Sequence, residues 1–475
     1  MSGSLGQVRS WVDSNFGGTV GTRRHVAGRS RLLIGLILSI FGIAFETIGV
    51  ATAMPTVMRD LDAPHLYAWA FSTMVTGMLL ATLLAGRLTD RVGPLTPMVA
   101  GYVMFSVGLV AGALAPTVWV LLAARFVQGL GAGALSLALF VTIALVFDGA
   151  QRATVLGALS FVWLLPAFIG PPIAAWMTLI SWRLVFSAML PLLVVAAALA
   201  LPAMRQVQAI FDPAEESETI QWWAVVLVAV SPALVQLAGE PLGAWSVVAG
   251  VVGLVALVVG LPRVMPRAIK LFGSGLGPVV LTRGLMAGCF FAAEAFVLLV
   301  LQNLRGLTVF EAGISLTIGS VGWSAGSWSQ ARPWVKLRRD QIITLGSVLC
   351  AVGLVTMVGF IAWTGSPLWL GVLGWVIAGL GMGVMMPSTA VAIMGLSSAQ
   401  EQGRNNSALQ VAEGLGNALM TGLAGAIYAG AVRQVSSQTS FVWLFSVLTV
   451  VCLLAFVVSR RIGPIDNESL VTVTG

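Results

Sequence analysis

Four ionisable side chains lie in segments that are otherwise apolar, and they are the residues most able to do chemistry. Glu46 lies within the uncharged run 32–58, and Glu294 and Glu413 occupy similar surroundings later in the chain. Arg125 is the one base that we place inside such a segment. A charge in a bilayer costs at least about 2.5 kcal/mol, so intramembrane charges usually mark ion or substrate paths. This pattern indicates an ion-coupled transporter rather than an anchor.

The composition is that of an all-α polytopic membrane protein. Of the 475 residues, 58% are hydrophobic and 9% are charged, and the mean hydropathy is +0.97. Soluble domains carry roughly 25% charged residues. The net charge of +7 does not indicate nucleic-acid binding, because the basic residues are scattered through short loops. The sequence lacks a phosphate-binding Gly-Lys-Ser/Thr loop, and both histidines lie outside the membrane core, so we expect neither an ATPase nor an enzyme.

Apolar segments of about 20 residues, the length that a bilayer requires, recur along the whole chain. An even number of them places both termini on the same side of the membrane. We expect fourteen transmembrane helices, at 31–58, 66–86, 95–115, 117–147, 154–178, 183–203, 221–239, 243–262, 276–304, 310–330, 341–363, 367–395, 405–431 and 439–460.

The loop charges predict the orientation of these helices. Lys and Arg, Arg283 among them, fall mostly in alternate loops on the side of the N-terminus, whereas the other side holds Arg59, Arg183, Arg305 and Arg433. Positively charged loops usually face the cytoplasm. The sequence therefore predicts a multi-pass protein of the cytoplasmic (inner) membrane with both termini in the cytoplasm.

The order of the helices suggests two pseudo-symmetric six-helix bundles with two inserted helices between them. Glu46 and Glu294 each lie in the first helix of a predicted copy, and similar Gly-rich exits at 86–91 and 326–332 end the second helices. Internal repeats of this kind place a substrate site at the midplane between the halves. The predicted parts are a tail (1–30), the first bundle (31–203), a cytoplasmic linker (204–220), the inserted helices (221–262), the second bundle with its entry loop (263–460) and a tail (461–475).

Four segments resemble motifs of the major facilitator superfamily, specifically its fourteen-helix drug:proton antiporter group. The resemblance covers essentially the whole chain. Where Glu46 stands, that group usually has Asp, and two basic residues that normally complete the loop motif are replaced by Pro94 and Leu95. The segments are the helix 2–3 loop motif at 86–93, the helix-4 motif at 122–129, the antiporter motif at Gly157 and 170–172, and the first-helix motif at 45–48 and 53–55.

The resemblance assigns roles to several of these residues. It implies that Arg125 is a proton-relay or gating arginine in the first bundle. It also implies a conformational latch at the helix 2–3 loop, although a tight turn with positive-inside charges would explain the same residues. The gating residues are Gly86, Arg87, Asp90, Arg91 and Gly93. The antiporter motif supplies hinge residues, which we expect to bend or break helix 5 where it faces helix 8 or the other half. They are Gly157, Gly170, Pro171 and Pro172.

The acids and aromatic residues supply the remaining site predictions. We expect Glu46 to couple protons or bind a substrate cation, Glu294 to act as its counterpart in the facing half, and Glu413 to serve as a cytoplasmic gate. Glycines at alternate positions, 129–133 and 379–383, predict close helix contacts. Lipid-facing positions would explain the aromatic residues equally well, but we predict that a cavity is lined by Phe161, Trp163, Phe290, Phe291 and Trp323.

Taken together, these patterns predict a proton-coupled exporter of amphipathic or cationic compounds. A dedicated exporter of an endogenous lipid or metabolite is the alternative. A membrane scaffold or sensor fits poorly, because it needs neither Glu46 nor Arg125 in the membrane. We expect a monomer whose partners are small amphipathic molecules and membrane lipids, with protons as the coupling ion and with no cofactor, metal ion or nucleic acid.

Overall fold

Helices account for the regular secondary structure of the described part of the chain. The computed structural model describes residues 28–147, 149–209, 211, 221–241, 243–266, 269–271, 273–330, 332, 334–397 and 402–465. The predicted tails and much of the predicted linker lie outside these ranges. The helices are α2 (Arg29–Asp60), η1 (Pro64–Leu66), α3 (Tyr67–Val92), α4 (Leu95–Ala113), α5 (Val118–Val146), α6 (Gly149–Ile180), α7 (Arg183–Ser187), α8 (Met189–Ala209), α9 (Trp222–Leu237), α10 (Ala244–Val264), α11 (Leu276–Arg305), α12 (Val309–Ser329), α13 (Arg339–Ala362), α14 (Leu368–Gly395), α15 (Gln402–Ala431) and α16 (Ser437–Ser459).

Each predicted span overlaps a helix, although the range 183–203 is divided at Ala188 into α7 and α8. Ten of the described helices are long and apolar enough to cross a membrane, which makes this a multi-pass membrane protein. The other four long helices, α6, α9, α12 and α15, do not meet those criteria over their described residues. The total of fourteen transmembrane helices therefore stays a prediction. Helix α12 packs against α6, and α15 packs against α3, so protein rather than lipid covers part of the surface of each.

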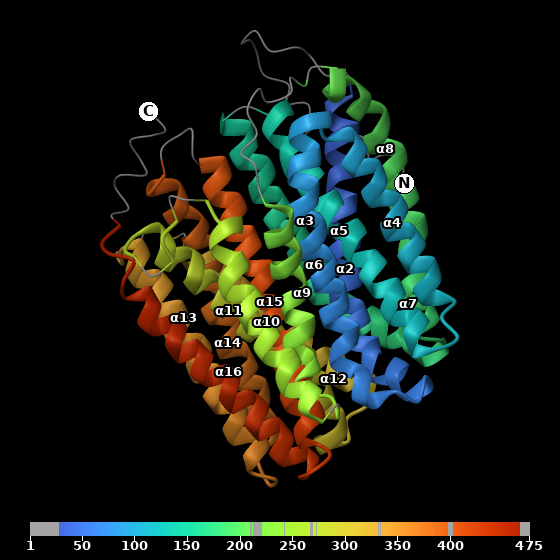
Figure 1. Ribbon diagram of the computed structural model, residues 1–475, viewed down its shortest axis with the longest axis vertical. Coiled ribbons are helices and arrows are strands. Elements are labelled where there is room, and N and C mark those ends of the chain that lie inside the picture. Colours follow the sequence, from blue (N-terminus) through green and yellow to red (C-terminus); the bar gives the residue numbers. More distant parts are fainter. Residues whose placement is uncertain are drawn as a thin grey trace.

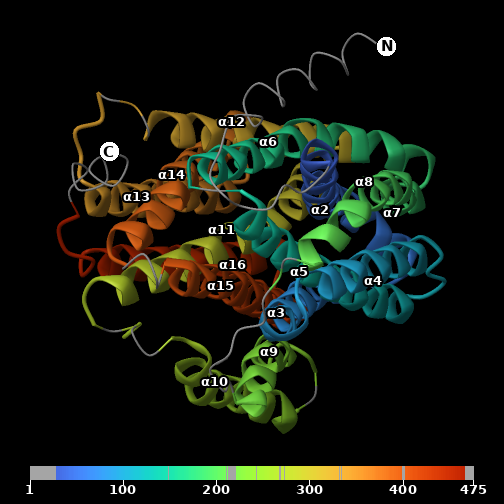
Figure 2. The same cartoon turned by 90° about the horizontal axis from the view of Figure 1, so that it is seen from above.

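The two halves of the chain pack in the same pattern. In the first half α3 and α4 flank α5, while α2 packs on α6 and α8. In the second half α12 and α13 flank α14, while α11 packs on α15 and α16. Figure 2 shows α2–α8 on one side of the bundle and α11–α16 on the other, with α9 and α10 at its edge. The two halves thus share one packing pattern, while their division into six-helix bundles with two inserted helices stays a prediction.

The alternating glycines explain why α5 and α14 lie at the centre of these contacts. A Cβ atom on Gly129 or Gly133 would meet the backbone of α3, whereas one on Gly131 would meet the backbone of α4. In α14 the same spacing brings Gly379 and Gly383 against α12, and Gly381 against α13. Small residues let helix backbones approach closely in membranes. The predicted close contacts are confirmed in both halves.

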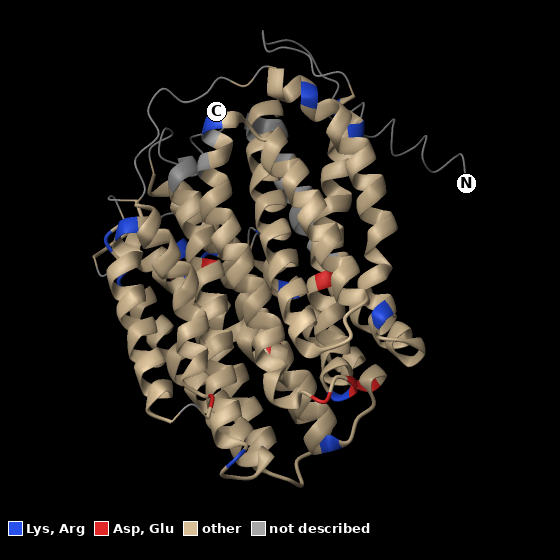
Figure 3. Ribbon diagram, turned by 45° about the vertical axis from the view of Figure 1, so that its right-hand side comes forward, with Lys and Arg blue, Asp and Glu red and all other residues tan. Residues whose placement is uncertain are grey.

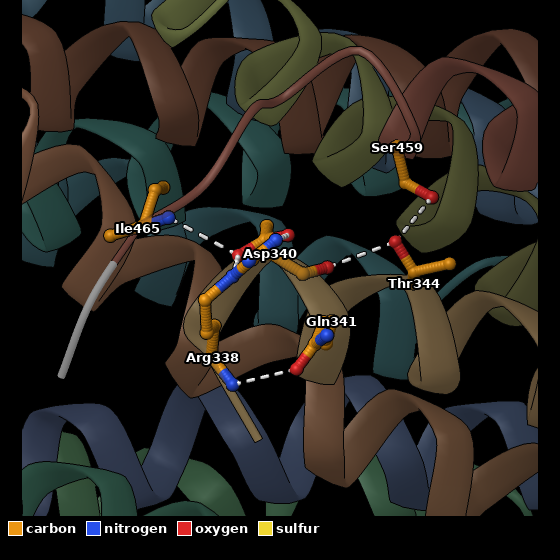
Figure 4. Close-up of polar contacts among 6 residues, drawn as sticks. All are labelled: Arg338, Asp340, Gln341, Thr344, Ser459 and Ile465. Atoms are coloured by element: carbon orange, nitrogen blue, oxygen red, sulfur yellow. Dashed lines mark hydrogen bonds and ion pairs between the residues drawn. The ribbon is translucent and has the colours of Figure 1, made fainter.

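The helices alternate in direction, so the bundle has two ends (Figure 1). We call them the Arg29 end, where α2 begins, and the Asp60 end, where α2 meets α3. Helix α16 finishes at the Arg29 end, where Ile465 donates its backbone N–H to Asp340 at the start of α13 (3.2 Å; Figure 4). Charged residues gather toward the two ends, with few between them (Figure 3). This distribution is expected of helices that cross a bilayer.

Candidate functional site

Glu46 and Arg125 form an ion pair inside the first half. Glu46 lies on α2 and Arg125 on α5, and their side chains are 0% and 2% exposed. Arg125 donates through Nη1 to Oε1 of Glu46 and through Nε to the carbonyl oxygen of Ala70 on α3 (3.0 Å). The sequence predicts both ionisable residues but not their pairing, because 79 positions separate them. The pair joins three helices and neutralises both charges.

The ion pair leaves two buried polar atoms unpartnered. Gln128, one turn from Arg125, accepts a hydrogen bond from Nη1 of Arg125 (3.3 Å). Its amide nitrogen and the second carboxylate oxygen of Glu46 are buried without a described hydrogen-bond partner. A buried polar atom without a partner costs about 1–3 kcal/mol, so such atoms call for an explanation. The free oxygen of Glu46 could accept a proton without displacing any described hydrogen bond.

Glu294 lies in the second half beside a cluster of aromatic rings. Its side chain on α11 is half-buried, and no ion pair or hydrogen bond to the described residues holds it. Phe290, one turn earlier on the same helix, lies 5.3 Å from Trp323 and 4.7 Å from Trp375, measured between ring centroids. Phe291 lies 6.2 Å from Trp323. Three of the five predicted aromatic residues therefore meet.

The prediction of a lined cavity still stands untested for these aromatic residues. The side chains of Phe161 and Trp163 lie outside the described part of the structure. Trp375 on α14, 3% exposed, joins the cluster although it is not among the aromatic residues predicted from the sequence. Its position one turn before the first glycine of 379–383 is the signal that could have identified it.

Glu413 pairs with Arg283, which sequence reasoning missed. Arg283 donates through Nη2 and Nε to Oε2 of Glu413 (2.7 and 3.0 Å), and through Nη1 to the hydroxyl of Thr389 (2.8 Å) and the carbonyl of Met386. The two charged side chains are 13% and 24% exposed. The placement of Arg283 with the loop charges is therefore wrong: it lies in the second turn of α11, and Arg125 is not the only base within a span.

The loop between α3 and α4 is held by a residue from α8. Gly93 ends α3 with a φ of 80°, a conformation that suits glycine. Gln208 donates to the carbonyl of Val92 (2.7 Å) and accepts from the N–H of Leu95 (3.3 Å). Gly86 lies within α3 and Arg91 is exposed, but the side chains of Arg87 and Asp90 lie outside the described residues. The latch at this loop stays a prediction.

The antiporter motif does not break its helix, because α6 continues through Pro171 and Pro172. A proline lacks the N–H that would bond the carbonyl four residues earlier. The carbonyls freed in this way belong to Ala167 and Phe168, and both face α12. The carbonyl of Ala167 accepts a long hydrogen bond from Ser320 (3.3 Å). The hydroxyl of Thr317 lies 3.4 Å from the carbonyl of Phe168 and 3.2 Å from that of Gly313 within α12, so the two carbonyls share its one proton.

These bonds identify the surface that the motif faces. Of the two surfaces predicted for it, the structure shows the other half of the chain. Gly170 is buried on α6, and a Cβ atom there would lie 3.5 Å from Ile48 of α2. Gly157 lies earlier on α6, where side chains are not described. The prolines thus supply acceptors between the halves, while a bend in the helix stays a prediction.

Comparisons with known proteins agree with this arrangement. The chain is 22% identical over 325 residues to the multidrug efflux pump SdrM of Staphylococcus aureus, covering 67% of this chain and 73% of the relative. It is 25% identical over 428 residues to the probable multidrug-efflux transporter Rv1634 of Mycobacterium tuberculosis, covering 84% and 87%. It is also 25% identical over 412 residues to the multidrug transporter protein MdtP of Bacillus subtilis, covering 84% and 75%.

Solved structures show the same fold. An auto-inhibited POT family peptide transporter superposes with a TM-score of 0.69 at 15% identity, covering 92% of this chain and 98% of that one. The human organic anion transporter MFSD10 gives 0.62 at 14% identity, covering 91% and 98%. The sequence profile of the Major Facilitator Superfamily matches residues 32–360 and 333–472. The chain therefore belongs to the Major Facilitator Superfamily.

Proposed function

We propose that this protein is a proton-coupled antiporter that exports amphipathic or cationic compounds across the cytoplasmic membrane by alternating access. The observation that carries the proposal is the sealed pair of Glu46 and Arg125, in which one carboxylate oxygen has no described partner. A sealed carboxylate can exchange a proton only when the surrounding helices open, so protonation and conformation are linked. The relatives named as multidrug efflux proteins support the direction and the substrate class.

The substrate would bind between the halves, with Glu294 contributing from the second half. This acid has no described counter-charge, and the rings of Phe290, Phe291 and Trp323 lie close by on α11 and α12. An aromatic face attracts a cation, and the attraction grows when water is excluded. Amphipathic cations combine the two properties that this site would recognise, an apolar surface and a positive charge.

The exchange of proton for substrate would follow from competition for the acids. Glu46 would release its proton as the cationic compound binds, and protonation from the outside would release the compound and permit the return to the inward-facing state. The Asp60 end is closed in this conformation, because Tyr67 donates to the carbonyl of Ala295 and Arg59 to the side chain of Gln302 (3.3 Å) across the halves. Given the predicted orientation, that end faces outward.

The partly exposed pair of Arg283 and Glu413 would act as a gate near the cytoplasm. It binds three helices, α11, α14 and α15, and Gly414 on the same turn as Glu413 lies next to Leu79 of α3. A rearrangement of this ion pair would thus alter contacts in both halves. We further propose a monomer with both termini in the cytoplasm, surrounded by lipid, that uses protons and no cofactor.

Transport of ethidium into inside-out proteoliposomes tests the proposal. With a pH gradient imposed, we expect uphill movement that stops when the gradient is collapsed and that Glu46→Gln abolishes. Glu311→Gln is the matched control, because Glu311 lies exposed at the start of α12 and glutamine can keep its capping box. Unimpaired uphill transport in folded Glu46→Gln protein would refute the role of this acid. No movement of any dye by the folded protein would favour a dedicated lipid or metabolite substrate.

A further inference from the structure

The hairpin of α9 and α10 covers a seam between the two halves. Helix α9 packs against both α3 of the first half and α15 of the second half, while α10 packs on the outside of α9. Figure 2 shows the hairpin at the edge of the bundle, beside α3 and α15. The opposite seam, between α6 and α12, has no such cover among the described helices. Any movement of one half against the other would therefore change the contacts of the hairpin with at least one of them.

The hairpin is fitted closely to the second half. A Cβ atom on Gly239 would collide with the backbone of Ala426, and one on Gly422 would lie 2.8 Å from the carbonyl oxygen of Pro232. Arg433, just after α15, donates to the carbonyl of Gly239. Contacts in which backbones approach this closely depend on shape and do not tolerate sliding. We expect α9 to move together with α15 as one body.

The connection to the first half combines less extensive helix packing with a side-chain hydrogen bond. The indole Nε1 of Trp69 on α3 donates to Oε1 of Glu240, which follows α9, over 2.9 Å. The other oxygen of Glu240 lies 4.0 Å from Arg433, so the carboxylate stands between the two halves. Ser246 holds the backbone carbonyl of Glu240 (2.6 Å) and fixes the turn. Helix α9 also packs on α3, though less extensively than on α15, and this side-chain hydrogen bond to a charged acceptor adds to that packing.

From this asymmetry we propose that the α9–α10 hairpin is a latch for the Asp60 end. It travels with the second half and holds the first half through Trp69 and Glu240 while that end is closed. Opening of the Asp60 end breaks this hydrogen bond and leaves the glycine contacts with α15 intact. The inference rests on the alternating access of the proposed function, but it concerns an equilibrium between conformations that can be measured without transport.

Distances between spin labels on the two halves test the latch. Labels at His65→Cys and Thr364→Cys would report the Asp60 end, because His65 in η1 and Thr364 after α13 are both exposed there and the three native cysteines are buried. In nanodiscs we expect Trp69→Phe to raise the ratio of open to closed molecules about tenfold, since a hydrogen bond to a charged group is lost. Glu240→Ala should give a similar shift.

The chain offers a matched control at the same end. Trp182 donates its indole Nε1 to Asp60 over 2.7 Å, but both residues belong to the first half. Trp182→Phe should therefore leave the distance distribution unchanged. Combining Trp69→Phe with Glu240→Ala should add nothing to either alone, because both remove the same bond.

Three results would overturn the latch. They are an unchanged distribution in Trp69→Phe, an equal shift in Trp182→Phe, and full additivity in the double variant. A failure of ethidium transport would leave this test intact, since the distances need no substrate. If the protein moved no dye while Trp69→Phe still shifted the populations of closed and open molecules, that result would support the latch and refute the proposed substrate class.

Discussion

The sealed ion pair makes a prediction that separates stability from transport. Replacing Glu46 by Gln leaves Arg125 without a counter-charge, although the carbonyl of Ala70, the side chain of Gln128 and the new amide oxygen can still accept its hydrogen bonds. Replacing Arg125 by Met leaves the acid without its base. Changing both residues together removes both charges and leaves no buried ion. The three variants should therefore differ in stability in a way that their transport does not.

The expected magnitudes follow from the burial of the pair. Breaking a buried ion pair by removing one partner costs about 3–5 kcal/mol, whereas replacing both partners is often close to neutral. The pair is 0% and 2% exposed, so solvent offers little relief to a stranded charge. We expect Glu46→Gln to destabilise the protein by about 3 kcal/mol, because the amide oxygen can still accept from Arg125. Arg125→Met should cost about 5 kcal/mol. The double variant should lose less than about 2 kcal/mol.

The assay is unfolding in mixed micelles, followed by the fluorescence of the 16 tryptophans, alongside the ethidium assay. Arg338→Met is the control, because its pair with Asp340 is 44% and 14% exposed and exposed pairs contribute about 0–1 kcal/mol. All three core variants should lack uphill transport, and the double variant should be the most stable of them. A double variant destabilised by the sum of the single effects would refute the pairing in the folded protein.

Two further predictions test helix packing. Gly131→Ala should destabilise the protein by about 1–3 kcal/mol, because its Cβ would overlap the backbone of α4, whereas Gly359→Ala, with open space at its Cβ, should be neutral or stabilising by up to about 1 kcal/mol. The same unfolding titration compares them, and equal effects would contradict the close contact. Replacing Thr317 by Val and Ser320 by Ala should loosen α6 from α12 and raise the open population in spin-label measurements, while Ser324→Ala, which removes a bond within α12, should not; each long bond lost is worth at most about 1 kcal/mol.

Local sequence signals predicted the helices well and their partners poorly. The apolar runs located every long helix, because the period and length of a bilayer-spanning segment are properties of the segment itself. The break at Ala188 and the continuity of α6 through its prolines were not predicted. Those outcomes depend on neighbours, since Thr317 and Ser320 of α12 supply the hydrogen bonds that α6 lacks.

The site shows the same division. Glu46 and Arg125 were predicted because each is a charge in an apolar run, and Glu294 and Glu413 were predicted for the same reason. Arg283 was missed because it lies close to a helix start, where a base resembles a loop charge until its partner is seen.

The sequence by itself determined the class of this protein: an α-helical membrane protein with two similar halves, acids within its spans and glycines spaced for close packing. These are properties of composition and spacing, which do not depend on how the helices pack against one another. Only the tertiary structure decided the pairings, joining Arg125 to Glu46, Arg283 to Glu413, and Glu240 to Trp69 and Arg433. Pairing depends on which helices become neighbours, and that choice follows from the packing of whole helix faces rather than from any one segment.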